Sequence, residues 1–402
     1  PAACITLAIS DKAEGPFIPA KDYDPALYKQ STLVRYVWSN KGAQNSKIGY
    51  DSSFNTANEN WENGFGCIDP EFVMDVATGQ LMKYDIGGNE CYALTYGSWK
   101  GGIALVYVDA KTFKPVNDKT GEELDAPLDS IEGNCGTLIA GGFGAAYEGA
   151  QLIYNSETGY YYIFVSMGDL NIEYRVGVGR SKELTGPYKD PKGTAMKFNN
   201  AGIAQTYHAI GGKIIGAYQF SSGFGFTSPG GQSILRDDKG RILFACHSRT
   251  NFMTLDNFTL QVRTMHFTED GWPVLNMNEY TEVDDDDTSI TMADLVGDWE
   301  VIVTERSENT SIDGTATGSK NISIAADGSV SGKYKGSVSI AEDGHTITFD
   351  LKKIGVCKGW AGFALDTGRR SGNNEQRRTV TFSTLNTGKS GKKGEYFFGN
   401  KK

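Results

Sequence analysis

Two stretches of the chain repeat one pattern: Ser10-Asp-Lys-Ala-Glu-Gly-Pro-Phe17 and Ser181-Lys-Glu-Leu-Thr-Gly-Pro-Tyr188. Both consist of Ser, four residues, Gly-Pro and an aromatic residue, and each directly follows an apolar, strand-like run. Self-similarity of this kind is typical of repeated four-stranded blades. A chance coincidence of two Gly-Pro turns is the alternative. The repeat favours a β-propeller over a sandwich or a single barrel for this part of the chain.

Short strand-like runs bounded by Gly, Asn, Asp and Pro recur before residue 283, whereas helical periodicity is scarce. Composition agrees, because 50 of the 402 residues are Gly, and Tyr and Phe number 20 each. The sequence therefore predicts an all-β protein. The clearest runs are Leu33–Trp38, Gly102–Val108, Gln151–Tyr154, Tyr160–Ser166, Val176–Gly179, Lys213–Tyr218, Ile242–His247 and Leu260–Phe267.

Four consecutive aspartates, Asp284–Asp287, interrupt this pattern. Like charges repel one another and stay solvated, so we expect an acidic linker over residues 284–291 between a propeller (1–283) and a second domain (292–402). A calcium loop is the alternative, but the alternating ligands and turn glycine of such loops are absent. Further short strands predict a small antiparallel barrel or sandwich in the second domain. They are Gly297–Val303, Lys320–Ile324, Gly328–Tyr334, Ser337–Ile340, Thr346–Leu351, Arg378–Ser383 and Glu395–Phe398.

Charge and cysteine content exclude several classes of protein. With 39 basic and 49 acidic residues the net charge is −10, which leaves no basic footprint for nucleic acid. No apolar run approaches the ~18 residues of a membrane helix. The six cysteines form no CxxC pair, which argues against structural zinc. A Cys67–Cys91 or Cys91–Cys135 disulfide and buried free thiols are both open.

Two carboxylates stand out as candidates for chemistry. Asp69 lies between a glycine-rich approach and a strand-like stretch, and Pro70 predicts an extended backbone that aims its side chain. Glu148 lies between the Gly/Ala-rich loop 140–146 and an apolar strand, where small neighbours leave open space and Tyr147 and Phe143 partly desolvate it, as suits a general acid. A strand-entry turn and a solvated loop glutamate are the respective alternatives.

Two further features offer contacts to a sugar. Trp99 lies in the turn between two strands, where an indole either stacks on a sugar ring or packs locally. His247 and Arg249 end another strand and provide hydrogen-bond donors. Paired carboxylates with aromatic residues are typical of glycoside hydrolysis, and no Ser/His/Asp or metal-ligand spacing competes with them.

In chain order, these motifs resemble the arabinanases of glycoside hydrolase family 43. The resemblance covers residues up to about 280, and the residues after about 290 resemble the small β-barrel of the family's larger members. It implies a five-bladed propeller, an inverting mechanism and α-1,5-linked L-arabinan as substrate, and with these a secreted or periplasmic hydrolase. The motifs are Ile68-Asp-Pro70, Tyr96-Gly-Ser-Trp99 with Gly101-Gly-Ile103, Tyr147-Glu-Gly149, Gly159–Ser166, Val178-Gly-Arg-Ser181 with Gly186-Pro-Tyr188, His247-Ser-Arg249 and Asp270-Gly-Trp-Pro273.

Roles follow from the resemblance residue by residue. Glu148 is similar to the family's general acid, and Asp69 to the carboxylate that orients and tunes that acid. The sugar cleft is expected to be lined by Ile68, Ser98, Trp99 and Tyr147, with His247 and Arg249 as further substrate contacts.

The family's general base is an Asp in the first blade, and no matching motif occurs in this chain. We expect it upstream, on a complementing N-terminal segment of the same protein, because a propeller without its first blade exposes sheet edges and apolar faces. An inactive chain is the alternative.

The family's axial ion is also in question. Many relatives carry Gly-His-Asn-Ser where this chain has Gly230-Gly231-Gln232-Ser233, so the usual histidine ligand of a structural Ca or Na ion is replaced by Gly231. His208 or Gln232 are substitute ligands, although a buried, satisfied histidine is the commoner outcome. The chemistry itself requires no cofactor.

Two other functions fit the same residues. One is a related activity, namely an exo-acting arabinanase, an arabinofuranosidase or a β-xylosidase, which product analysis distinguishes. The other is a non-catalytic carbohydrate-binding propeller.

Overall fold

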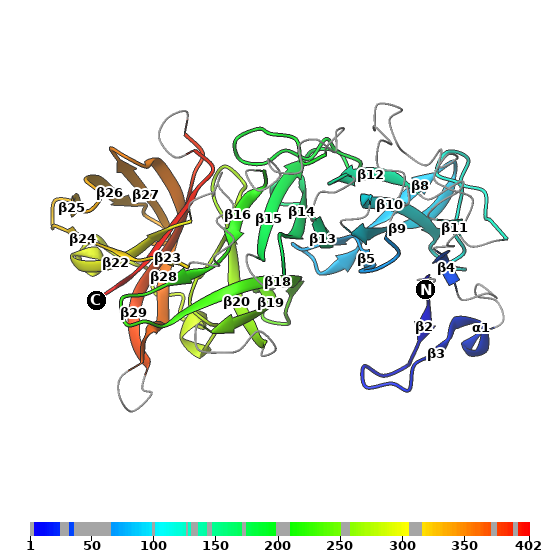
Figure 1. The fold of residues 1–402 in the computed structure, drawn as a ribbon, viewed down its shortest axis with the longest axis horizontal. Helices are drawn as coiled ribbons and strands as arrows, with labels where there is room; N and C mark the ends of the chain where they lie inside the picture. The colour runs from blue at the N-terminus through cyan, green and yellow to red at the C-terminus, as the bar shows by residue number, and fades with distance from the viewer. Residues whose placement is uncertain are drawn as a thin grey trace. The chain divides into compact units, whose positions relative to one another are not determined.

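The computed structural model describes residues 4–24, 32–35, 66–98, 101–125, 128–129, 136–142, 147–170, 174–197, 210–250, 258–304, 316–370, 376–388 and 393–402. Within these ranges the chain is almost entirely β-structure, with two four-residue helices, α1 (Ala20–Tyr23) and α2 (Met292–Leu295) (Figure 1). The predicted all-β class is confirmed. None of the described helices has the length and apolar character needed to cross a membrane.

The chain divides into two compact units. The first contains Pro1–Val165, Arg180–Tyr188 and Ala195–Tyr207, and the second contains Ser166–Gly179, Lys189–Thr194 and His208–Lys402. The strand β14 (Tyr160–Met167) passes from the first unit into the second. The domain bounds expected from the sequence stay a prediction.

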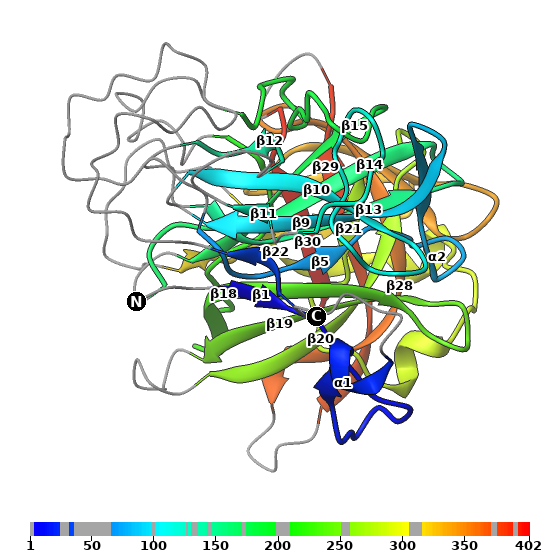
Figure 2. The same cartoon turned by 90° about the vertical axis from the view of Figure 1, so that its right-hand side faces the viewer.

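Antiparallel hairpins organise much of the first unit. One of them joins β9 and β10, pairing Ser98 with Gly102 and Cys91 with Asp109 (Figure 2). Buried side chains of this unit, among them Tyr96 and Val106, form one apolar core. Its strands are ordered in sheets as β1 (Cys4–Thr6), β4 (Thr32–Arg35) and β11 (Leu128–Asp129); β12 (Thr137–Ala140), β10 (Gly102–Asp109), β9 (Asn89–Ser98) and β5 (Glu71–Phe72), with β8 (Lys83–Ile86) on β9; β14, β13 (Tyr147–Asn155), β6 (Met74–Asp75) and β7 (Gln80–Leu81); and β2 (Ala8–Ile9) with β3 (Ile18–Pro19).

The repeated pattern in the sequence forms the same turn twice. The Ser10 and Ser181 hydroxyls accept hydrogen bonds from the backbone N–H two residues on, at 3.2 and 3.0 Å. Gly15 and Gly186 then close both turns with N–H bonds of 3.0 Å to the carbonyl three residues before them, at φ +87° and +90°. The internal repeat is therefore structural and not a coincidence of composition.

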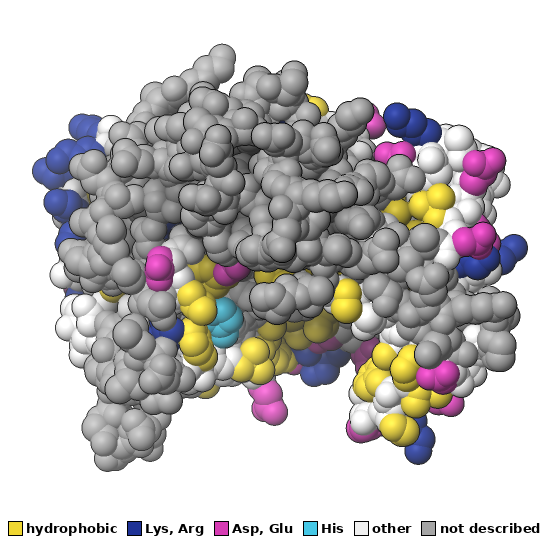
Figure 3. Space-filling view, turned by 45° about the vertical axis from the view of Figure 1, so that its right-hand side comes forward, with side chains coloured by type: hydrophobic (Ala, Val, Ile, Leu, Met, Phe, Trp, Pro, Cys, Tyr) yellow, Lys and Arg dark blue, Asp and Glu magenta, His cyan; other side chains and the backbone are white. Residues whose placement is uncertain are grey.

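The two copies differ in what covers the aromatic residue. Tyr188 is fully buried, whereas Phe17 is 61% exposed and Ile18 and Tyr23 beside it are also exposed. Figure 3 shows apolar side chains of this N-terminal segment gathered at the surface among charged ones. The aromatic residue of the repeat is thus exposed in the first copy, with other apolar side chains beside it, whereas it is buried in the second copy.

The second unit contains a blade-like sheet and a closed barrel. The sheet runs β21 (Pro273–Leu275), β20 (Thr259–Phe267), β19 (Ile242–Thr250), β18 (Gly225–Arg236), β17 (Tyr218–Gln219) and β23 (Thr317–Gly318), beside the paired β15 (Arg175–Ser181) and β16 (Gly212–Ile215). The barrel runs β22 (Gly297–Val303), β24 (Lys320–Ile324), β25 (Ser329–Gly332), β26 (Gly336–Ile340), β27 (Thr346–Leu351), β28 (Gly355–Arg370), β29 (Gln376–Asn386) and β30 (Tyr396–Lys401) (Figure 1, yellow to red). The predicted small antiparallel barrel is confirmed.

The barrel interior is filled by its own side chains. Trp299, Phe349, Phe382 and Phe397 pack with ring centroids 4.6–5.3 Å apart at its centre. Leu295 of α2 is buried against them, and the Trp299 indole N–H donates to the Leu295 carbonyl at 2.8 Å. Eight strands enclose just enough room for such a core.

The blade and the barrel of the second unit share a buried amide network. Asn278, just after β21, donates to Asn400 Oδ1 at 2.9 Å and to Thr381 Oγ1 at 3.2 Å. Asn400 in turn donates to Asn278 Oδ1 and to Asp366 Oδ1, both at 2.9 Å. All four residues are buried, so these bonds replace water for groups that have no other access to it.

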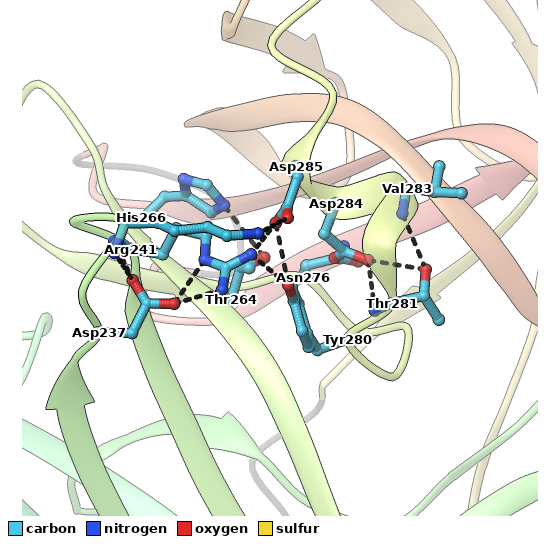
Figure 4. A network of polar contacts seen from close by, with 11 residues as sticks. Asp237, Arg241, Thr264, His266, Asn276, Tyr280, Thr281, Val283, Asp284 and Asp285 are labelled. Carbon is cyan, nitrogen blue, oxygen red and sulfur yellow. Dashed lines mark hydrogen bonds and ion pairs between the residues drawn. The ribbon is translucent and has the colours of Figure 1, made fainter.

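The acidic run does not form the solvated linker that its charge predicts. Residues Glu282–Asp285 form a 3-10 helix, η3, in which Asp284 caps the Thr281 N–H at 2.9 Å and accepts from Asn276 Nδ2 at 2.6 Å (Figure 4). Asp284–Asp286 are half-buried and only Asp287 is exposed. The expectation is wrong for three of the four aspartates because nearby groups offset their repulsion.

Cations that are distant in sequence, two in the turn between β18 and β19 and one on β29, supply most of that compensation. Arg241 pairs with both Asp237 and Asp285 (Figure 4). Lys239 Nζ lies 2.9 Å from Asp285 Oδ2. From the barrel, Arg378 pairs with Asp286. The hydrogen bonds from Lys239 and Arg241 lower the pKa of Asp285 to about 2.

We expect Arg241→Gln to lower the melting temperature at pH 7 by a few degrees. The Asp285 pKa is depressed in the folded state, so its contribution is present above its unfolded pKa of about 3.9 and is lost as pH falls through about 2. The difference from wild type should therefore shrink steadily below about pH 4. Thermal unfolding followed by circular dichroism from pH 7 to pH 3 measures this. Lys335→Gln removes an exposed charge elsewhere as a control, and an equal loss at every pH would contradict the assignment.

The described cysteines are thiols and do not form the disulfides considered above. Cys67, Cys91, Cys246 and Cys357 are buried, and Cys4 is exposed. Cys135 lies outside the described residues.

Candidate active site

The backbone fixes Asp69 at the entry to β5. The Ile68 carbonyl accepts the Gly97 N–H at 3.1 Å, and Glu71 pairs with Thr95 of β9 two residues later. Asp69 itself has φ +53°, so the extended conformation predicted from Pro70 is wrong. Aspartate tolerates the left-handed region better than most residues, although the conformation is still costly. Strained backbone of this kind concentrates at functional sites, where the surrounding structure holds it in place.

The structure brings the Asp69 side chain to the residue that follows Glu148. The Gly149 N–H donates to Asp69 Oδ2 at 3.2 Å. Strand β13 begins at Tyr147, so Glu148 is half-buried within a strand and is not the solvated loop glutamate considered as the alternative. Gly149 has φ +55°, a conformation that glycine adopts without the steric cost of a side chain. This bend next to Glu148 is what lets the strand meet the Asp69 carboxylate.

Asp69 is electrostatically unusual. The residue is exposed, yet protein atoms crowd its carboxylate, and this desolvation raises its pKa while the hydrogen bond from Gly149 works in the opposite direction. A carboxylate that is crowded on one side and open to solvent on the other is suited to act on a ligand that arrives from solution.

The other predicted residues of the first unit differ in exposure. Tyr147 is fully buried and Ser98 nearly so, whereas Ile68 is 40% exposed. The structure thus exposes Ile68 and buries Tyr147 and Ser98, and the role of these residues in lining the sugar cleft stays a prediction. Trp99 lies outside the described residues.

His247 and Arg249 form a cluster of their own in the second unit. The His247 ring stacks on Tyr174 with centroids 5.7 Å apart and meets the edge of Phe258 at 4.6 Å. Burial, with a smaller contribution from Arg249, lowers the His247 pKa, so the ring is neutral near pH 7. Arg249 donates to the Leu170 carbonyl at 2.9 Å and lies 3.9 Å above the Phe258 ring. Arg249 thus already has partners within the protein.

The candidates for the axial ion give a mixed picture. Gln232 Oε1 accepts a hydrogen bond from Ser166 Oγ at 2.9 Å, and the same hydroxyl accepts the Gly231 N–H at 2.8 Å. A Cβ at Gly231 would lie 2.8 Å from His247 Cδ2, so the His247 ring occupies the space beside this glycine. His208 lies outside the described residues, and the described part of the chain holds no group of three or more His, Cys, Asp or Glu placed to bind a metal. The ion stays a prediction.

The sequence analysis missed one carboxylate near Asp69. Glu71 Oε1 accepts a hydrogen bond from Gln151 Nε2 at 3.2 Å, next to the Asp69–Gly149 contact. Strand alternation could not have found it, because Asp69 has φ +53° and precedes β5, which begins at Glu71.

Two family descriptions match adjoining parts of the chain. Residues 105–273 match the glycosyl hydrolases family 43, and residues 277–392 match a C-terminal lipocalin-like domain. Among curated proteins, the extracellular endo-alpha-(1->5)-L-arabinanase of Thermotoga petrophila is 27% identical over 346 residues, covering 84% of this chain and 63% of its own length. The extracellular endo-alpha-(1->5)-L-arabinanase 2 of Bacillus subtilis is 28% identical over 307 residues, covering 73% and 59%.

Two solved structures have the same fold as this chain. The endo-1,5-alpha-L-arabinanase of Thermotoga petrophila superimposes with a TM-score of 0.73 at 22% identity, covering 99% of this chain and 78% of that one. A family 43 glycoside hydrolase from Bacillus licheniformis gives 0.71 at 22% identity, covering 99% and 77%. The chain spans about six-tenths of the length of the two curated relatives (63% and 59%). On these matches, residues 105–273 are similar to the glycosyl hydrolases of family 43, and residues 277–392 are similar to a C-terminal lipocalin-like domain.

Proposed function

We propose that the protein is an arabinan hydrolase that cleaves α-1,5-linked L-arabinan with inversion, outside the cell. The observation that carries this is the 3.2 Å bond between Asp69 Oδ2 and the N–H of Gly149, because it joins the two predicted catalytic segments at one point. The relatives, named extracellular endo-arabinanases, favour arabinan as substrate and endo action. A five-bladed propeller is the architecture that we expect to present these segments.

In the proposed reaction Glu148 protonates the glycosidic oxygen as the bond to the anomeric carbon breaks. An aspartate acts as general base on a water at the opposite face of the sugar, with the two carboxyls about 6.5–9.5 Å apart. We propose that this aspartate lies on a complementing N-terminal segment, and the exposed Phe17 surface supports an apolar contact there. Asp69 holds the bend after Glu148 and so aims the acid.

We expect Asp69→Ala to lower kcat on linear arabinan by about tenfold to a hundredfold. The substitution removes the acceptor of the Gly149 N–H, and small misplacements of a catalytic group are this costly. Asp85→Ala is the matched control, since Asp85 also accepts a glycine N–H, that of Gly88 at 2.8 Å, in an exposed turn. Full activity of the Asp69 variant would count against the proposal.

Product analysis tests the mode of action. We expect a mixture of oligosaccharides from linear arabinan at early times, as an endo enzyme produces. A single product size would instead assign an exo-acting arabinanase, and release from aryl arabinofuranosides or xylosides alone would assign the corresponding glycosidase. Binding of arabinan without any product would assign a carbohydrate-binding protein.

A further inference from the structure

Two segments of the first unit lie side by side in parallel. Strands β6 and β13 pair Met74 with Ile153 and Asp75 with Tyr154, and the Val76 N–H donates to the Tyr154 carbonyl at 2.8 Å. Ahead of this ladder the same two segments make two further contacts, offset from its register by one residue: Asp69 accepts from the Gly149 N–H and Glu71 accepts from Gln151, each at 3.2 Å. The segment that begins at Asp69 therefore contacts the strand that carries Glu148 at several successive points.

Glu71 is firmly placed to act as an anchor. Its backbone is paired with Thr95 of β9, and its carbonyl accepts the Thr95 hydroxyl at 3.3 Å. Its side chain is half-buried, and burial raises its pKa while the bond from Gln151 opposes the rise. Gln151 is only 3% exposed. A hydrogen bond to a carboxylate in such surroundings is stronger than one between two neutral groups.

The chain between Glu148 and this anchor is short and flexible by composition. Only Gly149 and Ala150 separate Glu148 from Gln151, and Gly149 has φ +55°. A bond to the Gly149 N–H alone leaves a pivot at that glycine, because glycine resists rotation less than any other residue. A second bond at Gln151 fixes the other side of the pivot.

We propose that Glu71 is a positioning residue of the reaction, which acts through Gln151 to hold the start of β13 and thereby the direction of Glu148. This inference rests on the proposed function and deepens it. Glu71 does not touch the substrate in this scheme. The pair Glu71–Gln151, which we call the clip, complements the Asp69–Gly149 bond.

The test compares Glu71→Ala with Glu71→Gln in the intact protein. We expect Glu71→Ala to lower kcat on linear arabino-oligosaccharides about 10- to 100-fold while KM changes less than about threefold. Glu71→Gln keeps an acceptor oxygen for Gln151 Nε2 and should restore kcat to within about threefold of wild type. A merely structural role would lower the amount of folded protein without this split between kcat and KM.

A second readout does not depend on turnover. Loss of the clip should speed hydrogen–deuterium exchange of the amides at 147–151 in Glu71→Ala but not in Glu71→Gln. Glu90→Ala is the control, since it removes a carboxylate from neighbouring β9 that pairs with exposed Lys83 at 2.8 Å. Unchanged exchange at 147–151, unchanged kcat, or a Glu71→Gln variant as impaired as Glu71→Ala would each overturn the proposal.

Failure of this inference and failure of the proposed function give different results. If the wild-type protein gives no product from arabinan, the proposed function is wrong, and if Glu148→Gln is fully active, the role of Glu148 as acid is wrong. If Glu148→Gln is inactive and Glu71→Ala retains full kcat, only the clip is wrong. If the protein has no turnover at all, the exchange measurement still decides whether Glu71 holds the start of β13.

Discussion

Replacing Glu148 with Gln should lower kcat on linear arabinan by about 10²–10⁴-fold, the range that a positioned general acid contributes. Glutamine has nearly the same shape and lies within β13 as the glutamate does, but it cannot donate a proton to the leaving oxygen. Binding should be almost unchanged, because the ground-state complex does not require that proton transfer. Reducing-end release gives kcat, and calorimetric titration with an arabino-oligosaccharide gives the affinity.

Glu157→Gln is the matched control for this experiment. Glu157 follows β13 in the same chain segment and its side chain is exposed, so it lies at the other end of the strand. We expect this variant to retain full activity. An active Glu148→Gln variant, or one that binds far more weakly without losing kcat, would remove Glu148 from the role of acid.

The second large effect is on stability. We expect Asn400→Ala to lower the free energy of unfolding by about 3 kcal/mol, since it leaves several buried partners without their hydrogen bonds. Asn278 loses both bonds that link it to Asn400, and Asp366 loses its amide donor. Urea denaturation monitored by tryptophan fluorescence measures the change.

Asn321→Ala provides the comparison for that measurement. Asn321 lies on strand β24 of the same barrel, but its side chain is exposed. We expect its removal to cost less than about 0.5 kcal/mol. If Asn400→Ala were equally mild, the buried network would not hold the blade and the barrel together.

Local periodicity predicted the barrel strands well and failed where glycine interrupts it. Thr346–Leu351 alternates cleanly between polar and apolar residues, Gly297–Val303 ends in an apolar run, and both strands have the predicted bounds. Strand Gly355–Arg370, the longest in the barrel, was missed because glycines and charged residues break its apolar pattern. Its pairing with both neighbours, a property of the whole barrel, determines its conformation.

The candidate site shows a similar division. The motif around Asp69 located the residue, but the rule for a residue before proline gave the wrong backbone conformation, since contacts from Gly97 and Gly149 override the local preference. Charge repulsion likewise predicted a solvated segment at Asp284–Asp286, and arginines distant in sequence reversed that outcome. Short-range rules describe an isolated segment, whereas these residues are determined by partners that the sequence does not place beside them.

The path of the chain between the blade and the barrel has a consequence for engineering and for descent. After β22 the chain leaves the barrel, contributes β23 to the edge of the blade sheet beside Tyr218, and returns to the barrel as β24. The barrel therefore contributes a strand to the blade sheet. Dividing the chain between the blade and the barrel at one point would remove β23 from β17, at the outer edge of that sheet. The barrel cannot be replaced by an unrelated domain without disturbing the blade sheet. We therefore expect the blade and the barrel to be inherited together and lost together.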